Sequence, residues 1–125
     1  MKALVLAAAA FAASIGTAQA QDLAAGEQSF RKCLPCHAVG PDARNKIGPI
    51  LNGIDGRKTG TTEYNYTEAN KKAEIVFGEA TFKDYIQNPM QKIPGTKMAF
   101  AGIKNETEIA ALWAYLKQFK ADGSK

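Results

Sequence analysis

The sequence predicts an all-α fold of four or five short helices joined by long loops. Apolar residues recur at helical spacing in several segments, most clearly near the C-terminus. Strand-like alternation of apolar and polar residues is weak along the whole chain. The 11 glycines and 5 prolines interrupt the helical segments and lengthen the loops between them. The length of 125 residues fits one domain.

The first twenty residues are predicted to be a cleaved signal peptide, which leaves one domain at residues 21–125. Lys2 supplies a positive start, residues 3–13 form an uncharged apolar run, and Ala18-Gln19-Ala20 is a small-x-small cleavage pattern. A retained membrane anchor is the alternative, but the run is short for a hydrocarbon core of about 30 Å. No later segment is apolar enough to cross a membrane. We therefore expect export to the periplasm.

The net charge is +4 and is not concentrated in dense Lys/Arg blocks. Nucleic-acid binders commonly show such blocks or a strongly basic stripe. We therefore expect no nucleic-acid partner for this chain.

The first helix is expected from Asp22, which can cap it, to about Cys33. Leu23, Gly26 and Phe30 fall on one face of this segment at i, i+3 and i+7. Loops are expected at residues 38–66 and 89–104, which are rich in Gly and Pro.

Two short helices are expected in the middle of the chain. Thr67 can cap a helix over residues 68–72. Residues 81–88 carry an apolar face, and Pro89 is expected to end that helix.

The last helix has the clearest pattern. Asn105 and Glu108 are spaced as in a capping box. Apolar residues then repeat at i, i+3, i+4 and i+7: Ile109, Leu112, Trp113 and Leu116. Gly26 would allow the first helix to cross this one closely, with Phe30, Leu112 and Tyr115 at the contact and Trp113 in the core.

Cys33 and Cys36 are the only cysteines, and they lie in Cys33-Leu34-Pro35-Cys36-His37. A disulfide between them would close a very small loop and stabilise little. A thiol oxidoreductase would place the pair after a strand, and a strand pattern is missing there. A structural zinc site needs four ligands, and His37 is the only histidine.

The remaining interpretation is covalent attachment of haem. Cys-x-x-Cys followed by His is the signature of c-type haem, in which two thiols bond the porphyrin and the histidine binds iron. A haem would also supply the apolar surface that a short chain with long loops lacks.

The ligand opposite His37 decides the function, because a vacant position permits ligand binding or peroxide chemistry and a filled one leaves electron transfer. The residues leave two candidates open, Met90 and Met98. Met98 is favoured because it follows Pro94 and Gly95 in a loop that can lie close to the ring. A haem enzyme or gas sensor with an open iron site is the alternative.

Taken together, the motifs resemble the class I cytochrome c family, and most closely the bacterial cytochromes c2. The resemblance covers nearly all of residues 21–125 and rests on Cys33 to His37, Gly48 to Gly53, Gly56 to Gly60, Tyr66 to Lys71, Tyr85 to Pro89, Ile93 to Met98, Phe100 to Gly102 and Ala114 to Leu116. It implies the cytochrome c fold wrapped around one covalent haem c, with His37 and Met98 as the axial ligands.

The resemblance also implies roles for the residues around the haem. Pro49 would accept a hydrogen bond from His37, and Arg57 and Tyr66 would hold a buried haem propionate. The remaining three would form a polar network beside Met98: Asn70, Tyr85 and Thr96. The chain departs from the family at Phe77, where a Trp that donates to the propionate is common, because Phe has no donor.

The resemblance finally implies a one-electron carrier rather than an enzyme. Its expected partners are a cytochrome bc1 complex as donor and a photosynthetic reaction centre or terminal oxidase as acceptor. The protein is expected to be a monomer that is not inserted in the membrane. The expected docking residues surround an exposed haem edge: Lys32, Lys46, Lys97, Lys104 and Phe100. Their positive charge would attract acidic partner surfaces.

Overall fold

The computed structural model describes residues 15–125, and their side chains from residue 22 onward. It contains five helices: α1 (Ile15–Phe30), α2 (Glu68–Lys72), α3 (Glu79–Ile86), α4 (Pro89–Lys92) and α5 (Glu106–Leu116). Across this part of the chain no β-strand forms, and Lys58 and Val76 make the one isolated antiparallel bridge. The all-α prediction is confirmed.

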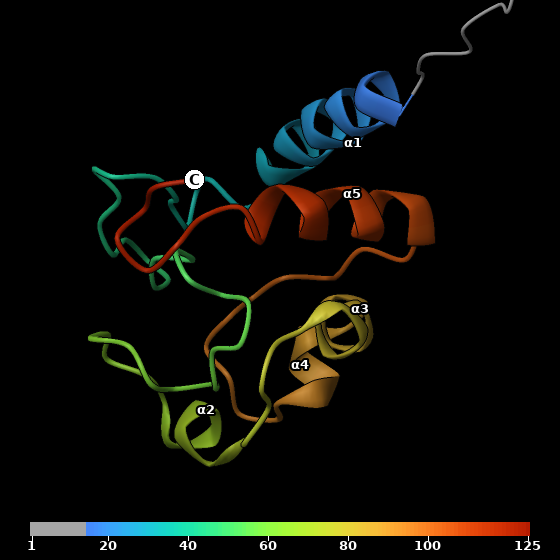
Figure 1. The fold of residues 1–125 in the computed structure, drawn as a ribbon. Coiled ribbons are helices and arrows are strands. Elements are labelled where there is room, and N and C mark those ends of the chain that lie inside the picture. Colours follow the sequence, from blue (N-terminus) through green and yellow to red (C-terminus); the bar gives the residue numbers. More distant parts are fainter. Residues whose placement is uncertain (1–14) are drawn as a thin grey trace, which may run out of the picture.

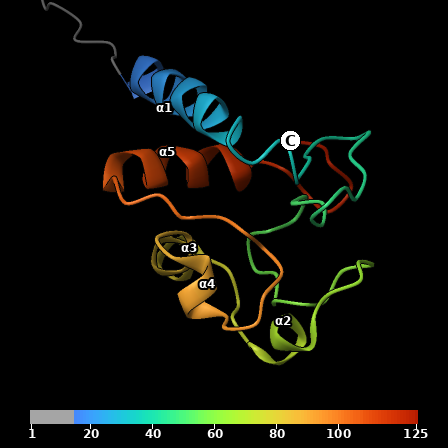
Figure 2. The ribbon, with the colours of Figure 1, turned by 180° about the vertical axis from the view of Figure 1, so that it is seen from behind.

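Helix α5 connects the two halves of the molecule. It packs against α1 on one side and against α3 on the other, and α3 also contacts α4 (Figures 1 and 2). Helix α2 lies apart from the α1–α5 pair in both views, and long loops join the two regions. None of the helices in residues 15–125 combines the length and apolar character needed to span a membrane.

The α1–α5 crossing is as close as the glycine predicts. A Cβ atom on Gly26 would lie 2.1 Å from the Ala111 carbonyl oxygen and 2.7 Å from the Tyr115 Cβ. Phe30 packs on Tyr115 with ring centroids 5.6 Å apart. Leu112 is fully buried next to them. The predicted contact is confirmed, and Ala111 is added to it.

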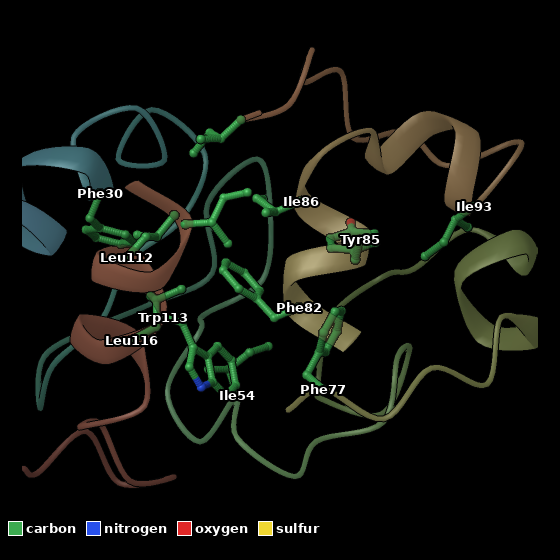
Figure 3. Packing of buried hydrophobic residues seen from close by; sticks show 12 residues of the cluster. Phe30, Ile54, Phe77, Phe82, Tyr85, Ile86, Ile93, Leu112, Trp113 and Leu116 are labelled. Atoms are coloured by element: carbon green, nitrogen blue, oxygen red, sulfur yellow. The ribbon is translucent and has the colours of Figure 1, made fainter. Parts of the chain in front are cut away.

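The core continues from this crossing to α3. Trp113 is buried, as expected, and its ring centroid lies 5.1 Å from that of Phe82 on α3. Figure 3 shows these side chains between the two helices, with Phe77 and Tyr85 on the far side of Phe82. The apolar side chains of α5 and α3 therefore form one continuous core.

The bounds of α1 differ from the prediction at both ends. The helix starts at Ile15, before Asp22, so Asp22 lies inside it and is not its cap. Residues 17–25 contain no Gly or Pro, and their alanines favour helix. The helix ends at Phe30 rather than near Cys33, and the chain continues in turns, in which the N–H groups of Arg31, Lys32 and Cys33 donate to carbonyls three residues back. The predicted boundary at residue 20 falls within α1, and most of the predicted signal peptide, residues 1–14, lies outside the described residues.

Two further differences concern the middle of the chain. Helix α3 spans Glu79–Ile86, two residues earlier than expected at each end. Pro89, expected only to stop a helix, also begins α4 in a segment predicted as loop. Proline is well suited to the first helical position because it has no N–H to satisfy there. The Asn88 side chain caps the new helix by accepting from the Gln91 N–H.

The caps of α2 and α5 agree with the prediction in part. Thr67 caps α2 by accepting from the Asn70 N–H. Asn105 caps α5 by accepting from the Glu108 N–H at 2.9 Å. The reciprocal half of a capping box is not formed in the described residues, because the Glu108 carboxylate instead accepts from Ser29 at 2.9 Å and pairs with Lys32. Glu108 therefore ties α5 to the segment around the first cysteine.

Candidate functional site

A cavity of about 380 Å³ lies between α5, α3, α2 and the loops that join them. Its walls are largely apolar and include Ile54, Phe82, Ile86, Leu112 and Leu116. All ten residues predicted to surround or bind the haem line this cavity: Cys33, Cys36, His37, Pro49, Arg57, Tyr66, Asn70, Tyr85, Thr96 and Met98. The fold thus brings together residues that are spread over 66 positions of the sequence.

The two thiols lie on one turn at the wall of the cavity. The Cys36 and His37 N–H groups both donate to the Cys33 carbonyl, at 3.0 and 2.8 Å. Both cysteines are free and half-buried. Burial raises the pKa of the Cys33 thiol to about 11, so it is protonated at neutral pH.

The His37 ring is fixed by two neighbours. Its Nδ1 lies 2.7 Å from the Pro49 carbonyl oxygen, which can only accept, so Nδ1 carries the proton. A Cβ atom on Gly48 would lie 2.5 Å from the ring, so only glycine fits beside it. Burial lowers the pKa of His37, which keeps the imidazole neutral. The Nε2 lone pair is therefore left for a metal.

The Met98 thioether is held by the polar residues predicted beside it. The Tyr85 hydroxyl donates to Sδ at 3.1 Å, and the Met98 N–H donates to the Thr96 hydroxyl at 3.2 Å. Burial raises the pKa of Tyr85 to about 12, so this donor stays protonated. Asn70 lines the same cavity but bonds to Thr67. Met90, the other candidate, is largely exposed and does not line the cavity.

Arg57 brings a positive charge to the cavity wall. Its Nη1 donates to the carbonyls of Ile50 and Asn52, at 2.9 and 3.2 Å. Among the described residues it pairs with no carboxylate, and burial lowers its pKa. The Tyr66 hydroxyl, on the same wall, bonds to Thr62. A half-buried guanidinium without an anion suits a carboxylate that arrives with a ligand.

The predicted docking residues divide into two groups. Lys32, Lys97 and Phe100 line the cavity, whereas Lys46 and Lys104 do not. Lys46 nevertheless lies close to the thiol turn, since its Nζ donates to the Leu34 carbonyl at 2.9 Å. The Lys104 Nζ donates to the Gln87 carbonyl at the end of α3.

Several residues at the site were not anticipated from the sequence. The Asn52 side chain accepts from the Gly40 N–H and donates to the Gly40 carbonyl, both at 2.9 Å, and so clamps the loop that carries Gly48 and Pro49. The Asn45 side chain joins Ile50 to Glu63. Thr59 is buried at the cavity wall. Asn52 and Thr59 lie in segments that carry the family resemblance, but neither the motifs nor the periodicity indicates the hydrogen bonds that these side chains make in the fold.

The donor set of this site fits a covalently bound iron porphyrin. Two thiols on one turn, a neutral imidazole with a free Nε2, and a thioether line a single apolar cavity. The described residues contain no group of three or more His, Cys, Asp and Glu side chains placed to hold a metal ion. The iron of a haem requires only the two axial ligands from the protein.

An all-α fold with this donor set around an apolar cavity defines a c-type haem protein. Comparison with known proteins identifies the family: the sequence model of the cytochrome c family matches residues 23–120 of this chain. The chain therefore belongs to the cytochrome c family, carries covalent haem c and is an electron carrier.

The chain is similar to several curated proteins over most of its length. It is 53% identical to cytochrome c2 of Blastochloris viridis, covering 100% of this chain and 99% of that protein. It is 61% identical to a cytochrome c2 of Rhodoplanes tepidamans, over 84% of this chain and 99% of that one. Among solved structures, cytochrome cH from Methylobacterium extorquens superposes with a TM-score of 0.72 at 37% identity, over 78% of this chain and 98% of that one. The resemblance to cytochromes c2 is confirmed.

Proposed function

We propose that this protein is an exported carrier that shuttles single electrons in the periplasm. Its donor would be a cytochrome bc1 complex, and its acceptor a photosynthetic reaction centre or a terminal oxidase. The observation that carries the proposal is the convergence of Cys33, Cys36, His37 and Met98 on one cavity, with Nδ1 and Sδ each held by a hydrogen bond.

The roles of these residues follow from their chemistry. Cys33 and Cys36 would hold the haem through two thioether bonds, and His37 and Met98 would occupy both axial positions of iron. The bound haem supplies a reversible one-electron Fe(II)/Fe(III) couple. With both axial positions filled by protein side chains, no substrate reaches the metal, which favours electron transfer over catalysis.

The surrounding residues would tune and shield the site. Pro49 orients the His37 ring, Tyr85 and Thr96 position Met98, and Asn70 adds a polar group on the same wall. Arg57 and Tyr66 would hold a propionate, since a buried carboxylate is costly without a cationic partner. The apolar walls exclude water, and this keeps the reorganisation around the site small.

We propose that the docking face is centred on the mouth of the cavity. Lys32 and Lys97 line the cavity and remain exposed, and the Lys46 ammonium lies beside the thiol turn. Phe100 would add an apolar contact with the partner at the centre of this docking face. Lys104 would extend the face toward α3, where its ammonium meets Gln87. Such a surface would guide an acidic partner and would not hold it tightly.

An absorption spectrum of the protein from an exporting host tests the site directly. We expect sharp haem bands that change on reduction and do not change when CO is added to the reduced protein. The Met98→Ala variant should bind CO readily, because its iron would lose one protein ligand, whereas Met90→Ala should behave as the wild type. CO binding by the wild type would favour the open-site enzyme or gas sensor, and a colourless protein would contradict the haem assignment.

The remaining parts of the proposal have separate tests. N-terminal sequencing of the protein recovered from the periplasm should begin at residue 21. Sedimentation at micromolar concentration should give a monomer. Retention of the protein in the membrane fraction, or an N-terminus at Met1, would contradict the predicted signal peptide.

A further inference from the structure

Thr59 has a buried hydroxyl whose hydrogen has no acceptor among the described residues. The residue is 5% exposed and lines the cavity. Its Oγ1 accepts from the Ile75 N–H at 3.2 Å. The hydroxyls of Thr61 and Thr81 instead donate to backbone carbonyls, at 2.6 and 2.7 Å. A buried donor that remains unused is costly, so such groups usually have a partner.

Two short stretches of extended backbone, residues 57–59 and 75–77, pair with each other beside this hydroxyl. The Thr59 N–H donates to the Ile75 carbonyl at 2.8 Å, and the Phe77 N–H donates to the Arg57 carbonyl at 2.9 Å. The bridge between Lys58 and Val76 lies between these two bonds. The paired backbone and the Ile75 N–H donor together hold the Thr59 oxygen, and the hydroxyl hydrogen is left to turn toward another acceptor.

Side chains alternate between the cavity and the solvent along the two paired segments, residues 57–59 and 75–77. In extended backbone, residues i and i+2 lie on the same face. Arg57, Thr59 and Phe77 all line the cavity, whereas Lys58 and Val76 between them are exposed. Thr59 thus shares its face with the guanidinium of Arg57 and with a Phe77 ring that has no donor.

We propose that the Thr59 hydroxyl donates a hydrogen bond to the haem propionate that Arg57 holds, as the donor that Phe77 cannot supply. The inference rests on the proposed haem site and adds a residue to it. The propionate oxygens accept hydrogen bonds, and a buried carboxylate binds more favourably with a second donor beside its cation. The hydroxyl would also offset part of the carboxylate's negative charge near the iron.

Three variants of the haem-loaded protein test this role. Thr59→Val removes the hydroxyl and keeps the shape, Thr59→Ser keeps the hydroxyl, and Thr61→Val removes a hydroxyl outside the cavity. Resonance Raman bands of the propionate and the midpoint potential would be measured for each. Thr59→Val should shift the propionate band and lower the midpoint potential, because an unscreened negative charge favours Fe(III). Thr59→Ser and Thr61→Val should match the wild type.

A second measurement does not depend on a variant that folds. In the reduced, diamagnetic wild type, proton NMR should show a slowly exchanging Thr59 hydroxyl with a cross-peak to a propionate methylene. An unchanged propionate band and potential in Thr59→Val, or a cross-peak from the hydroxyl only to protein protons, would overturn this inference alone. A wild type without haem would overturn both the inference and the proposed function.

Discussion

His37 and Met98 each make one polar contact that prepares the atom expected to bind iron. The Pro49 carbonyl accepts a hydrogen bond from Nδ1–H and so leaves Nε2 unprotonated, and the Tyr85 hydroxyl donates to Sδ. A hydrogen bond donated by Nδ1–H raises the strength with which Nε2 binds a metal, and a hydrogen bond donated to Sδ withdraws charge from the sulfur. Single atoms outside the ligand set therefore tune both ligands.

The ionisation of Glu108 is linked to the folded state. Lys32 and Ser29 both donate to its carboxylate, and these bonds lower the pKa of Glu108 in the folded protein. A lowered folded pKa stabilises the fold at pH above the unfolded value. That stability is lost as pH falls through the folded value. The side chains of Lys32 and Glu108 are both partly exposed, so their ion pair contributes only modestly to the free energy of unfolding.

The Glu108→Gln variant should therefore be less stable than the wild type by about 0.5–1 kcal/mol at pH 7. The difference should shrink as the pH falls below the ordinary carboxyl range, because the wild-type carboxylate is then protonated. Urea unfolding at pH 7 and pH 3 measures both values. Glu106→Gln is the control, since Glu106 is largely exposed and its one ion pair in the described part of the chain is with Lys83. A difference that stays constant with pH would contradict the linkage.

At the scale of elements, the crossing of α1 and α5 depends on the absence of one side chain. Gly26 lets the two backbones approach until its hydrogen faces the Ala111 carbonyl. Glycine lowers the helix propensity of α1 by about 1 kcal/mol relative to alanine. The packing of Phe30 on Tyr115 across the crossing contributes about 0.5–1.5 kcal/mol beyond its buried area, which is similar in size to this cost.

The Gly26→Ala variant should consequently lose stability, although alanine is the better helix former. A Cβ atom 2.1 Å from a backbone oxygen forces the helices apart, and such overpacking costs about 1–3 kcal/mol. Thermal unfolding of the haem-loaded protein measures the loss. Gly78→Ala is a matched control, because its Cβ would meet only the Thr81 hydroxyl at 3.9 Å. Equal effects of the two substitutions would show that the crossing is not tight.

At the scale of the whole molecule, the cavity occupies the place where a core would otherwise be. Its walls include apolar core side chains of α3 and α5, among them Phe82, Leu112 and Leu116. Burying apolar surface against a partner contributes about 25 cal/mol per Å², and these walls have no other partner among the described residues. The haem is therefore expected to be part of the core as well as the redox group.

Preventing haem attachment should leave the chain largely unfolded. The Cys33→Ser, Cys36→Ser double variant keeps the size of both side chains and cannot form thioether bonds. We expect its far-UV circular dichroism to lose most helical signal, and its peptide bonds to be cleaved rapidly by protease. Haem-loaded wild type at the same concentration is the control. A cooperative, native-like unfolding transition in the double variant would contradict this structural role.

The charge of the cavity mouth should control encounter with partners. Lys97→Glu and Lys32→Glu should each slow the second-order rate of electron transfer to an acidic partner several-fold at low salt, and raising the ionic strength should reduce both differences. Stopped-flow kinetics with a purified bc1 complex measures these rates. Lys120→Glu, at a position that does not line the cavity, is the control for net charge. Equal rates for all three variants would contradict a localised docking face.

Much of the architecture was predictable from local pattern. The caps of α2 and α5 and the apolar face of α5 depend on residues within one or two turns. The start of α1 and the short helix α4 were not predicted. The residues before Asp22 can form either a helix or an extended leader, and a proline can either end one helix or begin the next. Helix ends depend on small free energies that tertiary contacts easily outweigh.

The spacing of Cys33, Cys36 and His37 was enough to identify the class of cofactor. The distances between these three side chains are limited by the short stretch of backbone that joins them, so the sequence alone shows that they can bind one haem. The roles of Asn52, Thr59 and Glu108 emerged only from the folded molecule. Each acts on a partner at least 12 residues away, and no spacing along the sequence encodes such a contact. Local chemistry is a property of neighbouring residues, whereas a cavity and its donors exist only after distant segments pack together.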